Sequence, residues 1–243
     1  MAKKRLDALL HEKYPHYSRR QIQSWIMQRR AKVAGQIIDK AGTMLAEDVA
    51  LELDVHEPKF ISRAGFKLEK ALDHFTIDVT GLVAMDAGLS TGGFTDCLLQ
   101  RGIHKVYGID VGYGQVHEKI SSNPRVVVRE RTNLRTLTDL GELVDLVTLD
   151  LSFISVLKVM DAVNAVLKDD GQLIVLIKPQ FEAEKEDVGR GGLVKDPAVH
   201  ERVIKTLTEG VQEFGFALVG VIESPIEGAT GNKEFLAYFK RTT

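Results

Sequence analysis

The segment Leu82–Asp96 (LVAMDAGLSTGGFTD) is an apolar run that ends in an acid, continues through a glycine-rich turn and leads into a predicted helix. Gly88, Gly92 and Gly93 allow the backbone to turn sharply and to approach a ligand closely, because glycine has no Cβ. The N-terminus of the following helix offers free N–H groups. The segment therefore predicts a nucleotide-type cofactor site, although such turns also serve packing alone.

The spacing of these glycines separates two classes of cofactor. A dinucleotide fingerprint has the pattern G-x-G-x-x-G, and Gly88-Leu-Ser-Thr-Gly92-Gly93 lacks its second glycine, which disfavours a pyrophosphate. Asp86 at the end of the strand would repel phosphate but attract an ammonium group. A cationic, amino-acid-like cofactor such as S-adenosylmethionine is therefore predicted. Its expected site contains Asp86, Gly88, Ser90, Thr91, Gly92 and Gly93.

Length and composition set the class of protein. The 243 residues, 44% of them hydrophobic, suffice for one substantial core and a small accessory domain. There is no run of 18 apolar residues and no long apolar N-terminal segment, so a cytoplasmic location is expected. Cys97, the one cysteine, is expected in the core. No metal site is expected, because the sequence has no cluster of Cys and His residues.

Charge divides the chain into two parts. Residues 1–40 contain ten Lys and Arg against three acids, a net charge of +7, and the remainder contains 22 against 31, a net charge of −9. The basic part is predicted to be a small α+β module. Ser18 has the position of an N-cap for a helix with Ile22, Trp25 and Ile26 on its inner face. A hairpin turning at Gly35 and a strand over residues 49–55 are expected to follow.

The predicted helix that follows Ser18 has arginines near both of its ends, and guanidinium groups at these positions can bind the phosphates of a folded RNA. A solvated helix face is the alternative interpretation. Three segments of this module, Arg5-Leu-Asp-Ala-Leu-Leu, Ser18-Arg-Arg-Gln-Ile and Lys32-Val-Ala-Gly, resemble the RNA-binding domain named after ribosomal small-subunit protein four, over residues 3–56. We expect an RNA-binding domain at residues 1–58. Its predicted RNA contacts are Arg5, Arg19, Arg20, Arg29, Arg30 and Lys32.

Residues 59–243 alternate between predicted strands and helices, which indicates a doubly wound α/β sheet. The last two apolar runs, at residues 216–222 and 234–239, have no helix between them and are expected to pair antiparallel. A seven-stranded sheet with an antiparallel last strand resembles the Rossmann-like methyltransferases that use S-adenosylmethionine. The expected strands lie near 82–86, 105–110, 125–129, 144–150 and 172–178, and the expected helices near 62–72, 93–101, 113–121, 155–168 and 197–214.

Polar residues that follow the strands are the candidates for a site, because ligands of open α/β sheets bind at the carboxyl ends of the strands. Asp110 ends the second strand and is expected to accept the ribose hydroxyls of an adenosine. Asn133 follows the third strand and is expected to border the adenine ring, with an ordinary polar loop as the alternative. Asp150 and Lys178 follow neighbouring strands, where a structural ion pair is the alternative to a functional one.

Lys67 precedes the sheet and Glu234 begins the final strand, so two lysines and two acids are expected at one rim. Lys67, Asp150, Lys178 and Glu234 resemble the Lys-Asp-Lys-Glu catalytic tetrad of FtsJ-like RNA 2′-O-methyltransferases. The chain departs from its relatives around Gly88, where they usually have a valine and an alanine as neighbours. The segments that resemble the TlyA family, often labelled hemolysin A, are Ser62-Arg-Ala-Gly-Phe-Lys-Leu, Asp96-Cys-Leu-Leu-Gln, Asp150-Leu-Ser-Phe-Ile-Ser, Lys178-Pro-Gln-Phe-Glu and Gly231-Asn-Lys-Glu.

The resemblance implies methyl transfer to a ribose hydroxyl, which must lose its proton as the oxygen attacks. We assign Lys178 as the base, because burial and the nearby Lys67 favour its neutral form, whereas Asp150 and Glu234 favour the charged form. A charged Lys178 would instead position the hydroxyl and stabilise the developing oxyanion. The polar segment 182–197, with Arg190 and Lys195, is expected to be a substrate-ordered lid or a plain mobile loop.

Three functions fit these features: a ribosomal RNA 2′-O-methyltransferase, a membrane-lytic protein as the hemolysin label suggests, and a non-catalytic RNA-binding factor for ribosome assembly. Lysis is disfavoured, because no spanning segment and no long basic amphipathic helix is evident. An assembly factor would not need all four tetrad residues. We therefore expect an enzyme whose basic module finds ribosomal RNA or a ribosomal subunit and whose sheet domain methylates it.

Overall fold

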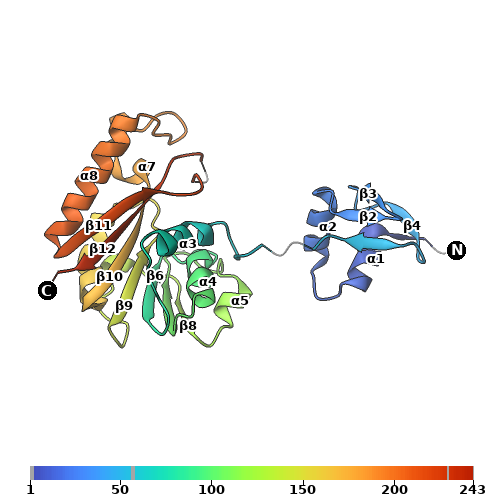
Figure 1. The fold of residues 1–243 in the computed structure, drawn as a ribbon, viewed down its shortest axis with the longest axis horizontal. Helices are drawn as coiled ribbons and strands as arrows, with labels where there is room; N and C mark the ends of the chain where they lie inside the picture. Colours follow the sequence, from blue (N-terminus) through green and yellow to red (C-terminus); the bar gives the residue numbers. More distant parts are fainter. Residues whose placement is uncertain (1–2, 56–57, 229, 243) are drawn as a thin grey trace. The chain divides into compact units, whose positions relative to one another are not determined.

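The computed structural model describes residues 3–55, 58–228 and 230–242 (Figure 1). The chain divides into two compact units, Met1–Pro58 and Lys59–Thr243. Each unit has a hydrophobic core of its own.

The first unit combines two helices with short strands. Ser18 caps the second helix as predicted, since its hydroxyl accepts the Gln21 N–H while the Gln21 side chain accepts the Ser18 N–H. The core contains Leu6 and Leu10 from the first helix and Ile22 and Ile26 from the second. The elements are β1 (Lys3–Arg5), α1 (Leu6–Lys13), α2 (Arg19–Met27), β2 (Ala31–Val33), β3 (Gln36–Ile38), β4 (Met44–Ala46) and β5 (Leu51–Leu53).

Strand pairing in the first unit adds one feature that the sequence did not indicate. Strands β3, β2 and β5 form an antiparallel sheet, in line with the predicted hairpin and strand. Strands β1 and β4 form a second, two-stranded sheet in which Lys4 pairs with Leu45. The charged Lys3-Lys4-Arg5 run has no alternation that would indicate a strand, and its partner lies far along the chain.

The second unit is the predicted seven-stranded sheet, in the order β11-β12-β10-β9-β6-β7-β8 (Figure 1). Strands β8, β7, β6, β9 and β10 are parallel, and β12 runs antiparallel between β10 and β11, which confirms the predicted fold class. The order reverses direction between β6 and β9, which is where such sheets bind ligands. The strands are β6 (Val83–Ala87), β7 (Lys105–Ile109), β8 (Val126–Arg129), β9 (Val144–Leu149), β10 (Leu167–Ile177), β11 (Phe216–Glu223) and β12 (Phe235–Arg241).

Helices cover both faces of this sheet, because its central strands are apolar on both sides. Leu173 and Val175 of β10 face one cluster with side chains of α6 and α8, whereas Ile174 and Leu176 face another with α3 and α4. Cys97 is buried in the second cluster, as predicted. The helices are α3 (Ala64–His74), α4 (Gly93–Gln100), α5 (Glu118–Ser121), α6 (Met160–Val166), α7 (Pro179–Glu182) and α8 (Pro197–Glu213), with 3-10 turns η1 (Leu134–Thr136), η2 (Val156–Val159) and η3 (Lys185–Asp187).

Three boundaries differ from the sequence-based expectations. Helix α3 begins at Ala64 rather than Ser62, and no side chain caps it. The helix expected near 113–121 is reduced to α5, after a loop that contains Gly112 and Gly114. The single helix expected over 155–168 divides into η2 and α6, and β10 already begins at Leu167.

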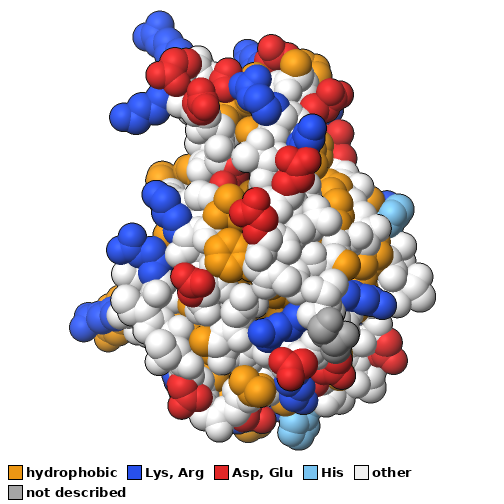
Figure 2. All heavy atoms as spheres, turned by 90° about the vertical axis from the view of Figure 1, so that its left-hand side faces the viewer, with side chains coloured by type: hydrophobic (Ala, Val, Ile, Leu, Met, Phe, Trp, Pro, Cys, Tyr) orange, Lys and Arg blue, Asp and Glu red, His pale blue; other side chains and the backbone are white. Residues whose placement is uncertain are grey.

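One face of the second unit carries charged side chains of both signs (Figure 2). On the face turned toward the viewer in Figure 2, which carries α8, acidic and basic side chains are interspersed without one continuous basic area. This face offers no large single-sign field for a polyanion.

Candidate active site

The turn after β6 brings two strand ends together. Gly88 has a φ of +86°, and a Cβ at this position would lie 2.3 Å from the carbonyl oxygen of Asp150, which follows β9. Gly92, with a φ of +99°, precedes the first turn of α4. Both positions require glycine, because other residues rarely adopt this backbone conformation. The loops after β6 and β9 therefore lie in direct backbone contact at Gly88, with no side chain between them.

A cavity of about 360 Å³ opens at the carboxyl ends of β6, β7 and β9, and Gly88, Ser90, Asp110, Asn133 and Asp150 contribute to its lining. Its apolar walls include Ile109, Leu134 and Ile154. A smaller cavity of about 60 Å³ shares residues with it and is lined by Ser90, Thr91 and Gly93 and by Ser62 and Ala64 before and in α3. Six of the eight predicted cofactor residues therefore line these two cavities.

Asp110 is held in the larger cavity by the backbone. One of its carboxylate oxygens accepts the Ser90 N–H at 2.7 Å and the other accepts the Gly112 N–H at 2.7 Å. Each oxygen retains a further acceptor position. Asn133 is exposed at the cavity. Its side-chain oxygen accepts the Arg135 N–H at 3.1 Å and thereby caps the N-terminus of η1.

Two of the predicted cofactor residues lie elsewhere. Gly92 is buried against Ile120. Asp86 is fully buried and lines neither cavity. Its carboxylate accepts hydrogen bonds from the Thr95 hydroxyl at 2.6 Å and from the Thr148 hydroxyl at 3.0 Å. Burial raises the pKa of Asp86 to about 6. In place of the predicted contact with an ammonium group, the structure gives Asp86 a role in joining β6, α4 and β9.

The four tetrad residues lie at one edge of the sheet. Lys178 follows β10 and Asp150 follows β9, and Nζ of Lys178 lies 2.7 Å from Oδ1 of Asp150. Lys67 on α3 forms an ion pair with Glu234, and both side chains are buried. In the antiparallel ladder Ile177 pairs with Phe235, so the residues next to them, Lys178 and Glu234, are neighbours across the ladder. The structure thus places all four residues at one edge of the sheet, as two ion pairs.

Lys178 has further neighbours that sequence reasoning missed. Its Nζ donates to the Ser152 hydroxyl at 3.0 Å. Phe153, the next residue, is 90% exposed and has a φ of +65°, a strained backbone conformation for a residue with a side chain. Its ring lies 5.0 Å from that of Phe181, and Phe153 also lines the larger cavity. The signal was present in the segment Asp150-Leu-Ser-Phe-Ile-Ser, of which only the acid was singled out.

The polar segment 182–197 is anchored at several points. The side chain of Asn232, which is buried, accepts the Val194 N–H at 2.9 Å and donates to the Gly192 carbonyl at 2.8 Å. Arg202 of α8 forms an ion pair with Asp187. These contacts connect residues 187–194 to Asn232 and to α8.

The predicted RNA contacts in the first unit fall into two groups. Arg5 and Arg19 both bind the carboxylate of Asp7. Within residues 3–55, 58–228 and 230–242, no ion pair involves Arg20, Arg29, Arg30 or Lys32. The second group is therefore available to an external anion.

None of the helices in the described part of the chain is long and apolar enough to cross a bilayer. The same residues contain no group of three or more His, Cys, Asp and Glu side chains placed to hold a metal ion.

Comparison with protein families assigns both units. The FtsJ-like methyltransferase family matches residues 60–241, and the S4 domain matches residues 4–49. The first match spans well over half of the chain. The chain belongs to the FtsJ-like methyltransferase family. Like its family, this FtsJ-like methyltransferase takes S-adenosylmethionine as its cofactor, which confirms the cofactor predicted from the sequence.

Individual relatives of this FtsJ-like methyltransferase carry two kinds of name. The 16S/23S rRNA (cytidine-2′-O)-methyltransferase TlyA of Mycobacterium tuberculosis is 40% identical over 98% of this chain and 90% of its own length. Hemolysin A of Brachyspira hyodysenteriae is 37% identical over 97% of this chain and 99% of its own length. A solved protein from Streptococcus thermophilus with a provisional hemolysin name has a TM-score of 0.75 at 36% identity and covers 100% of this chain and 90% of its own.

Proposed function

We propose that this protein methylates the 2′-oxygen of a ribose in ribosomal RNA, with S-adenosylmethionine as the methyl donor. The observation that carries the proposal is the Lys178–Asp150 ion pair, which adjoins a nucleoside-sized cavity at the same sheet edge as the Lys67–Glu234 pair. The name of the TlyA relative and the match to the S4 domain support ribosomal RNA as the substrate. Residues 1–58 would bind the RNA and residues 59–243 would modify it. A protein with this substrate acts in the cytoplasm, where ribosomes are.

The cavities fit S-adenosylmethionine in size and chemistry. In the larger cavity Asp110 has free acceptor positions for the two ribose hydroxyls, and Leu134 and Ile154 provide apolar surface for an adenine ring beside Asn133. The close approach at Gly88 leaves backbone rather than side chains next to the ligand. S-adenosylmethionine supplies a methyl group bound to a positively charged sulfur. Ser90, Thr91 and Gly93 in the smaller cavity are the groups that we assign to the amino-acid part.

Lys178 is the residue that we assign to the proton of the ribose hydroxyl. As the 2′-oxygen bonds to the methyl carbon, the carbon–sulfur electron pair remains on sulfur and the hydroxyl proton must leave. A neutral Lys178 takes this proton at Nζ, whereas a charged Lys178 donates a hydrogen bond to the oxygen as its negative charge develops and the proton passes to solvent water. Asp150 and Ser152 hold the amine in place in both cases, at 2.7 and 3.0 Å.

Tritiated methyl transfer from S-adenosylmethionine to purified ribosomal subunits tests the proposal. We expect transfer by the wild type and its loss in Lys178→Ala, with the methyl group recovered on a ribose 2′-oxygen after nuclease digestion and mass spectrometry. Lys168→Ala is the matched control, because Lys168 lies near the start of β10, at the opposite end of the strand from Lys178, and pairs with Asp145. Removal of residues 1–58 is expected to abolish transfer to subunits while leaving S-adenosylmethionine binding measurable by calorimetry.

Two results would overturn the proposal. Full transfer by Lys178→Ala excludes the assigned role of this lysine, and a methyl group on a base rather than a ribose excludes the reaction. The pH dependence of single-turnover transfer then separates the two forms of Lys178: a rate that rises about tenfold per pH unit below a plateau indicates a neutral base, and a flat rate indicates the charged form.

A further inference from the structure

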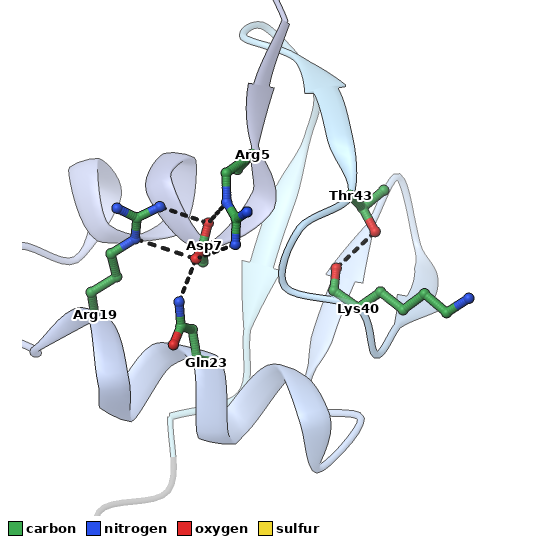
Figure 3. A network of polar contacts seen from close by, with 6 residues as sticks. All are labelled: Arg5, Asp7, Arg19, Gln23, Lys40 and Thr43. Atoms are coloured by element: carbon green, nitrogen blue, oxygen red, sulfur yellow. Dashed lines mark hydrogen bonds and ion pairs between the residues drawn. The ribbon is translucent and has the colours of Figure 1, made fainter.

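Asp7 is a buried carboxylate between two arginines that are predicted to contact RNA. It is 0% exposed and lies in the first turn of α1, within the same layer as Leu6 and Leu10. A buried charge is costly unless it is paired and hydrogen-bonded. Asp7 meets this requirement through Arg5, Arg19 and Gln23 (Figure 3).

Each arginine binds Asp7 through a two-pronged fork. Arg5 donates from Nε at 3.0 Å to one carboxylate oxygen and from an amino nitrogen at 3.1 Å to the other. Arg19 does the same with 3.2 and 3.1 Å. Gln23 donates a fifth hydrogen bond at 2.5 Å. These bonds, those from Arg5 foremost, hold the pKa of the Asp7 carboxyl well below its usual range. Asp7 therefore remains an anion at every pH at which RNA binding is measured.

The two forks leave part of each guanidinium available to solvent. Both arginine side chains are 50% exposed although their partner is not. Figure 3 shows that Arg5 and Arg19 approach Asp7 from opposite sides and that the amino nitrogen of each that does not bind Asp7 points away from it. Further N–H donors on each guanidinium have no hydrogen-bond partner among the described residues, and the buried carboxylate fixes their orientations.

We propose that Asp7 is a positioning residue that holds Arg5 and Arg19 ready to bind two phosphate groups of the RNA, one on either side. The proposal deepens the function proposed above and rests on it. Long side chains lose rotamer freedom when they bind, and a guanidinium that is already fixed loses less. Asp7 also removes one unit of positive charge from this surface. Simple Coulomb attraction therefore predicts that RNA binds better without Asp7, whereas the positioning role predicts the opposite.

This difference in sign makes Asp7→Asn a decisive variant. We expect it to bind purified, protein-free ribosomal RNA about fivefold more weakly than the wild type, although it carries one more positive charge. The slope of log K against log salt concentration should also decrease by about 1, because a phosphate contact is lost. Asp39→Asn is the matched charge control, since Asp39 is exposed and forms no ion pair among the described residues of its unit; its affinity should equal or exceed that of the wild type.

A second pair of variants tests the fork itself. Arg19→Lys keeps the charge but loses the fork, and should weaken binding about as much as Asp7→Asn. Lys40→Arg exchanges the same two residue types at an exposed position that is not a predicted RNA contact and forms no ion pair among the described residues of its unit, and should change little. Asp7→Asn and Arg19→Lys disrupt the same interaction. The double variant should therefore bind RNA no more weakly than either single variant.

A stability control separates positioning from simple loss of structure. Ile26→Val thins the core of the same unit and is expected to lower the melting temperature without changing RNA affinity or the salt slope. Asp7→Asn binding at or above the wild-type level, or an Ile26→Val loss equal to that of Asp7→Asn, overturns the positioning role. The readout is binding alone, so a wild type that binds RNA but transfers no methyl group would refute the proposed reaction and leave this test intact.

Discussion

Lys67 and Glu234 are 167 residues apart in the chain and form an ion pair that is almost closed to solvent, with side-chain exposures of 8% and 3%. The pair joins α3 to the start of β12, next to Lys178. It therefore has two separable effects, one on stability and one on the site. Removal of one partner leaves a buried charge without compensation, whereas removal of both leaves none.

Variants of this pair should separate the two effects. Lys67→Met and Glu234→Leu are each expected to lower the free energy of unfolding by about 3–5 kcal/mol. The double variant should lose less than the sum of the two, as measured by urea unfolding at neutral pH, yet remain unable to transfer a methyl group. A double variant with wild-type activity would show that the pair is structural only.

Phe153 is expected to stack on a base of the RNA beside Lys178. Its ring is exposed at the larger cavity, and stacking of a base on an aromatic ring contributes about 1–3 kcal/mol. Phe153→Ala should therefore lower kcat/KM for RNA by about 5- to 160-fold, and Phe153→Trp should retain most activity. Val219→Ala on β11, also exposed but outside the cavities, is the control. Equal kinetics for Phe153→Ala and the wild type would exclude stacking.

Asp86 should make the protein less stable as the pH rises. Its pKa is about 6 in the folded protein against 3.8 ordinarily, so between pH 4 and 6 the folded state keeps a proton that the unfolded state has lost. Asp86→Asn cannot show this loss. The free energy of unfolding of Asp86→Asn, relative to the wild type, should rise by roughly 2.5 kcal/mol from pH 4 to pH 7. Parallel stability curves for the two proteins would show that Asp86 is ionised throughout.

Gly88→Ala should abolish cofactor binding. The added Cβ would lie 2.3 Å from the Asp150 carbonyl oxygen, and the φ of +86° adds backbone strain. Gly191→Ala is the control for strain alone, because Gly191 has a φ of +79° and no atom within 4 Å of a Cβ. Calorimetry with S-adenosylmethionine should detect binding to Gly191→Ala and none to Gly88→Ala. Comparable binding by both variants would place the cofactor away from the loop after β6.

Asn232 should control the opening of the segment 187–194. Asn232→Ala removes its two hydrogen bonds to Gly192 and Val194, so trypsin should cut after Arg190 several times faster than in the wild type. Thr230→Ala, which removes a single bond to the Asn232 side chain, is the milder control. For a lid ordered by substrate, RNA together with S-adenosylmethionine should slow cleavage of the wild type. Equal cleavage with and without them would exclude the lid.

The sheet and its rim were predictable because they follow from local patterns and one topological rule. Apolar runs separated by helical segments identify the parallel strands, and polar residues after those strands meet at one edge. Asp150 and Lys178 were placed correctly on that basis. Glu234 joins them because the strand that it precedes runs antiparallel.

The remaining details depend on which way a side chain faces. Strand β6 is buried on both faces, so its sequence gives no alternation that would show Asp86 turned away from the cavities. The burial of Asp7 could not be predicted from the sequence. Leu6, Leu9 and Leu10 identify the apolar face of α1, but no pattern indicates that an acid next to them is buried as well. Ser152 and Phe153 lie in an irregular loop, where positive φ at a phenylalanine is not predictable from residue type.

Strand β12 lies between β10 and β11, so β10 has no partner on this side until β12 docks against it. Until it docks, β10 is an open edge with unpaired backbone groups, and such edges promote aggregation of a nascent chain. The same docking step delivers the partner of Lys67. Docking of β12 therefore both covers the edge of β10 and completes the Lys67–Glu234 pair. A partly folded molecule in which β12 has not docked should have no methyl-transfer activity.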